Sequence, residues 1–290
     1  MQNKQINEVK GESYLASAWR EFRKNRSAVL GIVVLALIVI LAVGADMIAP
    51  YDPFEQNYSQ ALQWPSMEHF FGTDEFGRDI FTRVLYGARI SLLVGVVSVT
   101  IACVFGSLLG ASAGYFSGTY DAVVMRCMDV LLAIPSLLLN ISIISALGAG
   151  VFNMMLAVGI SNIPRYCRIM RASVLQIKNM EYVEAARTAG ASDGRIIAQH
   201  IIPNCLAPII VQATLSVGSA IIACAGLSFI GVGISAPTPE WGAMLSNGRD
   251  FLRGYSYITL FPGLAIMITV LALNLMGDGL RDAFDPKLRR

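Results

Sequence analysis

Five long stretches of this 290-residue chain contain no lysine, arginine, aspartate or glutamate. A helix needs roughly 20 apolar residues to cross the hydrocarbon core of a bilayer, and each stretch is about that long or longer. Charged residues make up 14% of the chain, whereas a soluble protein carries about 25%. We therefore predict an all-α, multi-pass membrane protein rather than a soluble enzyme. The uncharged stretches are residues 27–45, 90–120, 130–164, 196–239 and 254–277.

Glycine and proline divide these stretches into six transmembrane helices. The apolar region from 123 to 170 is too long for one span, and we divide it at Gly148-Ala149-Gly150. The first apolar stretch follows a basic segment and is long enough to span, which favours an uncleaved helix over a signal peptide. The predicted spans are 28–48, 90–114, 123–146, 151–170, 206–230 and 258–277.

The basic residues set the orientation. Six spans place 17 of the 22 lysines and arginines on the side of the two chain ends and 5 on the other side. Cytoplasmic segments carry the excess of basic residues, so both ends are predicted to be inside. The predicted organisation is a cytoplasmic segment at 1–27, a first spanning helix at 28–48, an extracytoplasmic loop at 49–88, a five-helix core at 89–280 and a cytoplasmic tail at 281–290.

The sequence offers few candidates for a catalytic or metal-binding site. The two histidines lie far apart in the sequence, which argues against a histidine-built metal site and against a membrane enzyme. The five cysteines form no CxxC pair and are read as packing residues. A net charge of +2 without a basic patch indicates no nucleic-acid partner. Ion-coupled carriers usually have ionisable residues within their spans, and these are scarce here. A transport protein without catalytic, cofactor-binding or metal residues is favoured, with a secondary carrier or channel as the alternative.

Two patterns concern helix packing. Gly106, Gly110 and Gly114 recur every four residues and form a ridge on one helical face, which lets another helix approach closely. Asp129 lies three residues after Arg126, a spacing that allows a local ion pair.

Residues 178–203 join the fourth and fifth predicted spans on the cytoplasmic side. Their first half is rich in Ala, Glu and Arg and predicts a short helix that ends at Gly190. Small residues at Ala185 and Ala186 would let this helix enter a groove on a partner protein. A second short helix is expected to follow and to stop at Pro203. An ordinary amphipathic loop is the alternative interpretation.

The order Glu184-Ala185-Ala186, Gly190 and Ile202-Pro203 resembles the EAA loop in permease subunits of binding-protein-dependent ABC importers. His200 replaces an aliphatic residue of many members, a departure that is common in the peptide branch. Other motifs resemble the C-type permeases for dipeptides and oligopeptides, over nearly the whole chain. These are the first helix with 49–53, Phe71–Asp79, Leu227–Gly233, Pro237–Gly242 and Gly277–Asp282.

The resemblance implies the type I ABC importer permease fold in the bacterial plasma (inner) membrane. The chain has no GxxxxGK[ST] loop for ATP phosphates, so ATP and Mg would be bound by partner subunits. The implied partners are a second homologous permease, two cytoplasmic ATP-binding subunits and an extracytoplasmic substrate-binding protein. Di- or oligopeptides are the implied cargo, and nickel or a nickel chelate stays open. The implied ATPase-coupling residues are Glu184, Ala185, Ala186, Gly190, His200 and Pro203.

The extracytoplasmic segments are candidates for contact with the binding protein. Within residues 50–88, Thr73 is expected to cap a helix that runs through Gly87. The loop at 235–257 carries Trp241 and Tyr255. Interfacial anchoring by these aromatic residues is the alternative role for both segments.

Overall fold

The computed structural model describes residues 14–234 and 236–284. Parts of the expected cytoplasmic segment (1–13) and tail (285–290) lie outside the described residues, as does Ser235 of the expected 235–257 loop. The described chain is helical, and its β-type pairing is limited to an isolated bridge between Thr73 and Asp79. The helices are α1 Tyr14–Lys24, α2 Arg26–Val43, α3 Ala45–Ile48, α4 Ile80–Phe116, α5 Gly118–Ala133, α6 Ser136–Leu147, α7 Val151–Ile177, α8 Glu181–Thr188, α9 Asp193–Ile196, α10 Leu206–Phe229, α11 Trp241–Gly248 and α12 Tyr257–Phe284, with short 3₁₀ turns at Tyr58–Gln60, Ile202–Cys205 and Arg249–Phe251 and a π turn at Ile197–Ile201.

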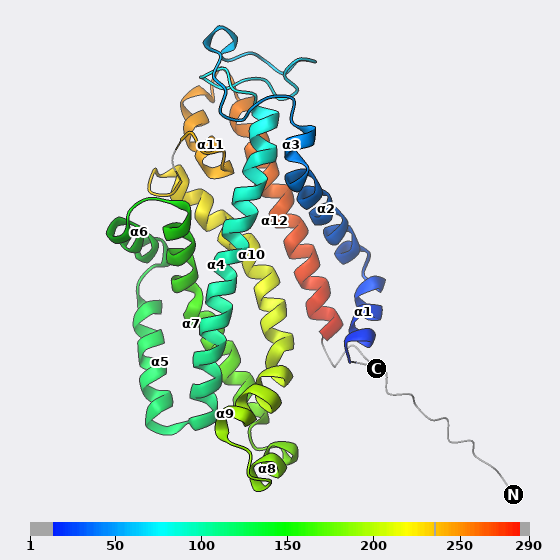
Figure 1. The fold of residues 1–290 in the computed structure, drawn as a ribbon, viewed down its shortest axis with the longest axis vertical. Helices are drawn as coiled ribbons and strands as arrows, with labels where there is room; N and C mark the ends of the chain where they lie inside the picture. The colour runs from blue at the N-terminus through cyan, green and yellow to red at the C-terminus, as the bar shows by residue number, and fades with distance from the viewer. Residues whose placement is uncertain (1–13, 235, 285–290) are drawn as a thin grey trace, which may run out of the picture.

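The long helices α4, α7, α10 and α12 run along the long axis of the molecule, and α2 packs beside α12 (Figure 1). The chain between α3 and α4 lies at one end of this axis with α11 nearby, and α8 and α9 lie at the other (Figure 1). We call these the outer end and the inner end. The helix α1 and the last turns of α12 both lie at the inner end, where they pack together. The first described helix and the end of the last one thus lie at the same end of the molecule, which agrees with a chain that begins and finishes on one side.

Among the described residues, four helical segments are long and apolar enough to cross a membrane. The pair α5 and α6 makes a fifth if it counts as one broken span. The 27-residue α7 is not among them, and its second half carries Arg165, Arg168 and Arg171. The multi-pass, all-α architecture is confirmed, while the count of six spans stays a prediction. The four segments are Arg26–Val43, Ile80–Phe116, Asp193–Phe229 and Tyr257–Phe284.

Two predicted spans are interrupted. The expected helix at 28–48 is divided at Gly44 into α2 and α3. The expected helix at 123–146 is divided into α5 and α6, whose axes differ by 92°. Pro135 causes this bend because proline has no N–H for the helical ladder and disfavours the helical conformation of the residue before it. Accordingly, Ile134 is extended, with φ −90° and ψ 126°.

The expected helix from Thr73 to Gly87 is wrong at its start, and it continues without a break through the expected span at 90–114. A single helix, α4, contains 37 residues from Ile80 to Phe116, about 55 Å at 1.5 Å per residue. Asp79 is its cap, because its Oδ2 accepts a hydrogen bond from the N–H of Thr82 at 2.7 Å. Thr73 instead lies in the preceding loop, where its hydroxyl accepts a hydrogen bond from the N–H of Gln63.

Glycines bring α4 and α7 into close contact. An added Cβ at Gly106 would lie 2.6 Å from the Cβ of Tyr166, and one at Gly114 would lie 2.9 Å from the Cβ of Val174. A Cβ at Gly110 would overlap the carbonyl oxygen of Cys167. The glycine ridge therefore faces α7, and the two backbones approach more closely than any side chain on the ridge would permit.

Candidate functional site

The helix α8 exposes one face and buries the other. Val183 is fully buried in the main hydrophobic core, and Ala186 packs against that core from a half-buried position. Glu184 and Ala185 are exposed. The inner end of the molecule thus presents a short helix whose outward side carries an acidic residue beside a small one (Figure 1).

Gly190 ends α8 through backbone geometry. Its φ is +81°, a conformation that L residues with a side chain rarely adopt. The N–H of Gly190 donates to the carbonyl of Arg187 at 3.0 Å, and the N–H of Ala191 donates to that of Ala186 at 3.1 Å. These two bonds form a Schellman motif, which turns the chain sharply from α8 toward α9. A Cβ at Gly190 would meet nothing within 4 Å, so the requirement is conformational rather than steric.

Pro203 does not end the second helix, in contrast to the expectation from sequence. The helical path continues from α9 through the π turn and the 3₁₀ turn into α10. The wider π turn precedes the proline, at the point where the regular ladder lacks a donor. His200 lies half-buried in this π turn, and its carbonyl accepts a hydrogen bond from Asn204 Nδ2 at 2.6 Å. Pro203 itself is exposed.

Tyr115, near the end of α4, connects to both helices of this element. Its hydroxyl donates to Asp193 Oδ1 of α9 at 2.6 Å. The same hydroxyl accepts a hydrogen bond from Arg187 Nη2 of α8 at 3.4 Å, and the guanidinium of Arg187 lies 5.7 Å from the ring centroid. We call these three residues the Tyr115 clasp. It joins α8 and α9 on either side of the Gly190 turn to the inner end of α4, a connection that the sequence did not reveal.

Ion pairs link α7 to α5 near the same end. Arg171 of α7 forms two hydrogen bonds to the carboxylate of Asp121 at 2.5 and 2.6 Å. Arg168 pairs with Asp129 at 2.6 Å. The partner of Asp129 is therefore on another helix, rather than Arg126 one turn away. Because arginine and carboxylate are planar, the two-bond pair also fixes the relative orientation of the helices.

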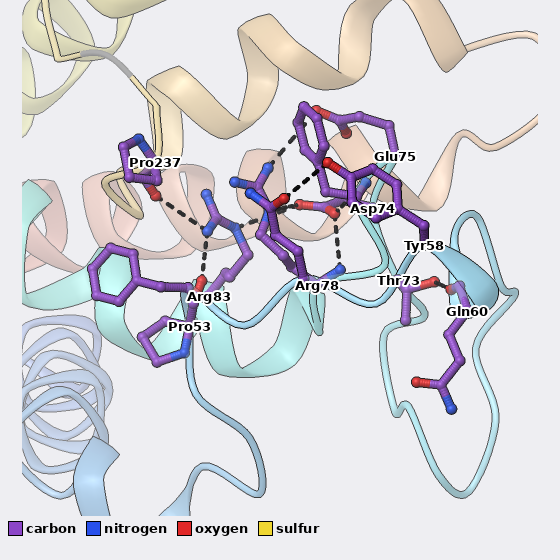
Figure 2. Close-up of polar contacts among 12 residues, drawn as sticks. Pro53, Tyr58, Gln60, Thr73, Asp74, Glu75, Arg78, Arg83 and Pro237 are labelled. Atoms are coloured by element: carbon purple, nitrogen blue, oxygen red, sulfur yellow. Dashed lines mark hydrogen bonds and ion pairs between the residues drawn. The ribbon is translucent and has the colours of Figure 1, made fainter.

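A buried charge cluster lies at the opposite, outer end (Figure 2). Asp74 accepts a 2.6 Å hydrogen bond from Arg78 Nε, and Arg83 Nε lies 3.7 Å from the same carboxylate. Both arginines are only 2% exposed. Arg83 also donates to the carbonyls of Pro53 at 2.7 Å and Pro237 at 3.3 Å, so it joins the loop after α3 to the loop before α11. We call Asp74, Arg78 and Arg83 the outer cluster.

Glu75 lies beside the outer cluster at 3.8 Å from Arg78. Its Oε2 is buried without a hydrogen-bond partner. Burial, and next the charge of Asp74, raises the pKa of the Glu75 carboxyl above its ordinary value.

The sequence profile of the binding-protein-dependent transport system inner membrane component matches residues 106–290. That of the N-terminal transmembrane domain of oligopeptide transport permease C matches residues 13–65. The second match covers α1 to α3 and part of the loop that follows. The two profiles together account for most of the chain, including α8 to α10, and leave residues 66–105 unmatched.

Curated relatives match over nearly their whole lengths. A dipeptide transport system permease protein, DppC, from Alkalihalophilus pseudofirmus is 47% identical over 94% of this chain and 91% of its own length. A di/tripeptide permease from Pseudomonas aeruginosa is 46% identical over 96% and 93%. A glutathione permease, GsiD, from Escherichia coli is 45% identical over 93% and 90%.

A solved structure shows the same fold at low sequence identity. A chain of the methionine ABC transporter MetNI, in an inward-facing conformation, superposes with a TM-score of 0.57 at 16% identity. The match covers 70% of this chain and 97% of that chain. Taken with the profile over residues 106–290 and the relatives above, the chain belongs to the family of binding-protein-dependent transport system inner membrane components, the membrane permeases of bacterial ABC importers.

Proposed function

We propose that this chain is one of two permease subunits in an ATP-driven importer of di- or oligopeptides. The exposed face of α8, with Glu184 and Ala185, is the docking surface for a cytoplasmic ATP-binding subunit. The observation that carries this assignment is the inner element itself: a short helix with an open polar face, fixed to the transmembrane helices by Val183 and by the Tyr115 clasp.

Such an element can transmit a conformational change. A subunit docked on α8 shifts the permease equilibrium only as far as it binds one permease state better than the other. Movement of α8 reaches α4 through Tyr115 and α10 through the continuous path from α9. The partner subunits hold ATP and Mg, and this chain supplies half of the transport pathway.

Peptide cargo is favoured by the relatives, whose names specify dipeptides, di- and tripeptides, and glutathione, itself a tripeptide. These names favour peptides over nickel. The extracytoplasmic binding protein delivers the cargo to the outer end.

Reconstitution tests the proposal. The chain, its partner permease, the ATP-binding subunits and the binding protein are placed in liposomes, and uptake of a labelled dipeptide is measured. Uptake is expected only with all components and ATP. Uptake by this chain alone without ATP would overturn the assignment in favour of a secondary carrier. Mass spectrometry of the ligand that copurifies with the binding protein identifies the cargo class.

A further inference from the structure

The outer part of the chain is acidic and contains unpaired carboxylates. From Ser27 to Gly77 the sequence has six acidic residues and no lysine or arginine. Three of the six acids are neutralised by arginines that follow: Asp46 pairs with Arg89, and Asp74 and Glu75 pair with Arg78. The other three are exposed and have no ion pair within the described chain: Asp52, Glu55 and Glu68.

These three carboxylates line one pocket of about 180 Å³ at the outer end, together with Asp79. No lysine or arginine lines this pocket. Its other walls are formed by Tyr51, Asn57, Gln60, His69 and Gly77. We call it the acidic pocket. Burial, and the charges of Glu68 and Asp79, raise the pKa of Tyr51 at its wall.

His69 provides a second observation, independent of the carboxylates. The residue is 2% exposed, its Nδ1 lies 3.0 Å from Asp79 Oδ1, and the ring of Tyr51 covers it at 4.8 Å. Nε2 is buried and has no hydrogen-bond partner. A buried polar nitrogen without a partner costs about 1–3 kcal/mol, so the pocket wall contains one polar group that the described residues leave unsatisfied.

The chemistry of the pocket fits a cation that donates hydrogen bonds. Its carboxylates and amide oxygens supply acceptors, and the ring of Tyr51 supplies an aromatic surface of the kind that attracts cations. A bare metal ion fits less well, because the described residues contain no group of three His, Cys, Asp or Glu side chains close enough to hold one. An ammonium or guanidinium group carries the complementary charge and supplies the hydrogen-bond donors.

We propose that the acidic pocket receives a lysine or arginine side chain of the extracytoplasmic binding protein. This inference rests on the proposed function. The residues that line the pocket belong to the chain between α3 and α4. This part of the chain lies at the outer end of the molecule (Figure 1), where a protein from outside would make contact. Complementary charge there increases the association rate and orients the incoming protein, more strongly at low ionic strength.

The test uses the assembled transporter in liposomes, titrated with the binding protein. The triple variant Asp52→Asn, Glu55→Gln, Glu68→Gln removes three exposed charges and leaves the outer cluster intact. We expect its half-saturating concentration of binding protein to rise by about tenfold at low ionic strength, with uptake at saturation unchanged. The difference in half-saturating concentration between the variant and the wild type should be smaller at high ionic strength. The control is Glu21→Gln, which removes an acid of α1 at the inner end, away from the acidic pocket, and should behave as wild type.

Charge reversal identifies the partner residue. Glu68→Arg should weaken binding further, and exchange of one lysine or arginine of the binding protein for glutamate should restore it. An unchanged half-saturating concentration in the triple variant would overturn the inference, as would a loss of uptake that saturation does not repair. Tighter binding of Ca²⁺ or Mg²⁺ by the wild-type permease than by the variant would assign the pocket to a metal instead. If the wild-type transporter shows no uptake at any concentration of binding protein, the proposed function is contradicted, and the inference about the acidic pocket is not what has failed.

Discussion

The outer end of α4 is held by charged side chains that are almost wholly buried, whereas the polar link from its inner end to α8 and α9 lies at the surface. At the outer end, Arg83 and Asp74 are both buried and form an ion pair, and Arg83 donates hydrogen bonds to backbone carbonyls of two distant loops. At the inner end, Tyr115 reaches Asp193 through a hydrogen bond exposed to solvent. Separating buried charges costs several kcal/mol, and breaking an exposed hydrogen bond costs about 1 kcal/mol. If a partner docks on the inner end as proposed, we expect the outer end to stay fixed while the inner end moves.

The largest effect is expected from Asp74→Asn. The substitution leaves Arg78 and Arg83 buried without their shared carboxylate and should destabilise the protein by about 3–5 kcal/mol. Thermal unfolding in detergent, followed by tryptophan fluorescence, measures the change. The control Asp250→Asn breaks an exposed pair with Arg249 and should change stability by less than about 1 kcal/mol. Equal unfolding midpoints for the two variants would show that the outer cluster does not fix this end.

Gly110→Leu tests the packing of α4 against α7 at the glycine ridge, which lies between the outer cluster and the Tyr115 clasp. The new side chain would overlap the carbonyl of Cys167 and the Cβ of Met170, so α4 and α7 must separate. We expect the free energy of unfolding to fall by about 1–3 kcal/mol, measured in the same unfolding experiment. Gly226→Ala is the matched control, because a Cβ there meets nothing within 4 Å. That control should be neutral or slightly stabilising, since alanine favours helix by about 1 kcal/mol. Similar losses in both variants would refute close packing as the role of the ridge.

Tyr115→Phe should separate stability from coupling. The ring and its packing stay, and only the hydrogen bonds to Asp193 and Arg187 are lost, so stability should fall by about 1 kcal/mol or less. Peptide transported per ATP hydrolysed should fall more clearly, because α8 and α9 lose their polar link to α4. Tyr58→Phe, which removes an exposed hydroxyl contact at the outer end, is the control. Unchanged stoichiometry in Tyr115→Phe would show that the clasp has no part in coupling.

The smallest expected effect concerns the pH dependence of the outer end. The pKa of Glu75 is raised by burial and then by Asp74. An acid with a raised folded-state pKa stabilises the fold below its unfolded value, here about 4.5, and this stabilisation is lost as pH rises through the folded-state pKa. Glu75→Gln should therefore reduce the decline in unfolding midpoint above pH 4.5. Parallel pH profiles for variant and wild type would contradict this reading.

The inner element was predictable from local sequence because its geometry is local. A short helix rich in alanine, followed by glycine, specifies the Schellman turn at Gly190 without help from distant residues. Glycines at a spacing of four likewise lie on one helical face wherever the helix packs. The structure shows that this glycine face packs against α7, which could not be predicted from the spacing alone.

Other features depend on contacts that sequence spacing does not encode. Arg83 reaches Pro53 and Pro237 across 30 and 154 residues, and Asp129 pairs with Arg168 across 39. The start of α4 at Asp79 follows from a tight loop with positive φ at Gly72 and Gly77, rather than from the capping residue that spacing suggested at Thr73. Pro203 was read as a stop because the π turn that accommodates it has no simple sequence signal.

The most direct test of the account is Glu184→Lys on the exposed face of α8. Copurification of the ATP-binding subunits with the permease is measured together with thermal stability and ATP-dependent uptake. We expect an unchanged unfolding midpoint, because Glu184 is exposed, with loss of the ATP-binding subunits and of uptake. Glu21→Lys, a charge reversal on α1 at the same end, should retain the ATP-binding subunits and ATP-dependent uptake. Full association and full uptake in Glu184→Lys would contradict the assignment of α8 as the docking surface.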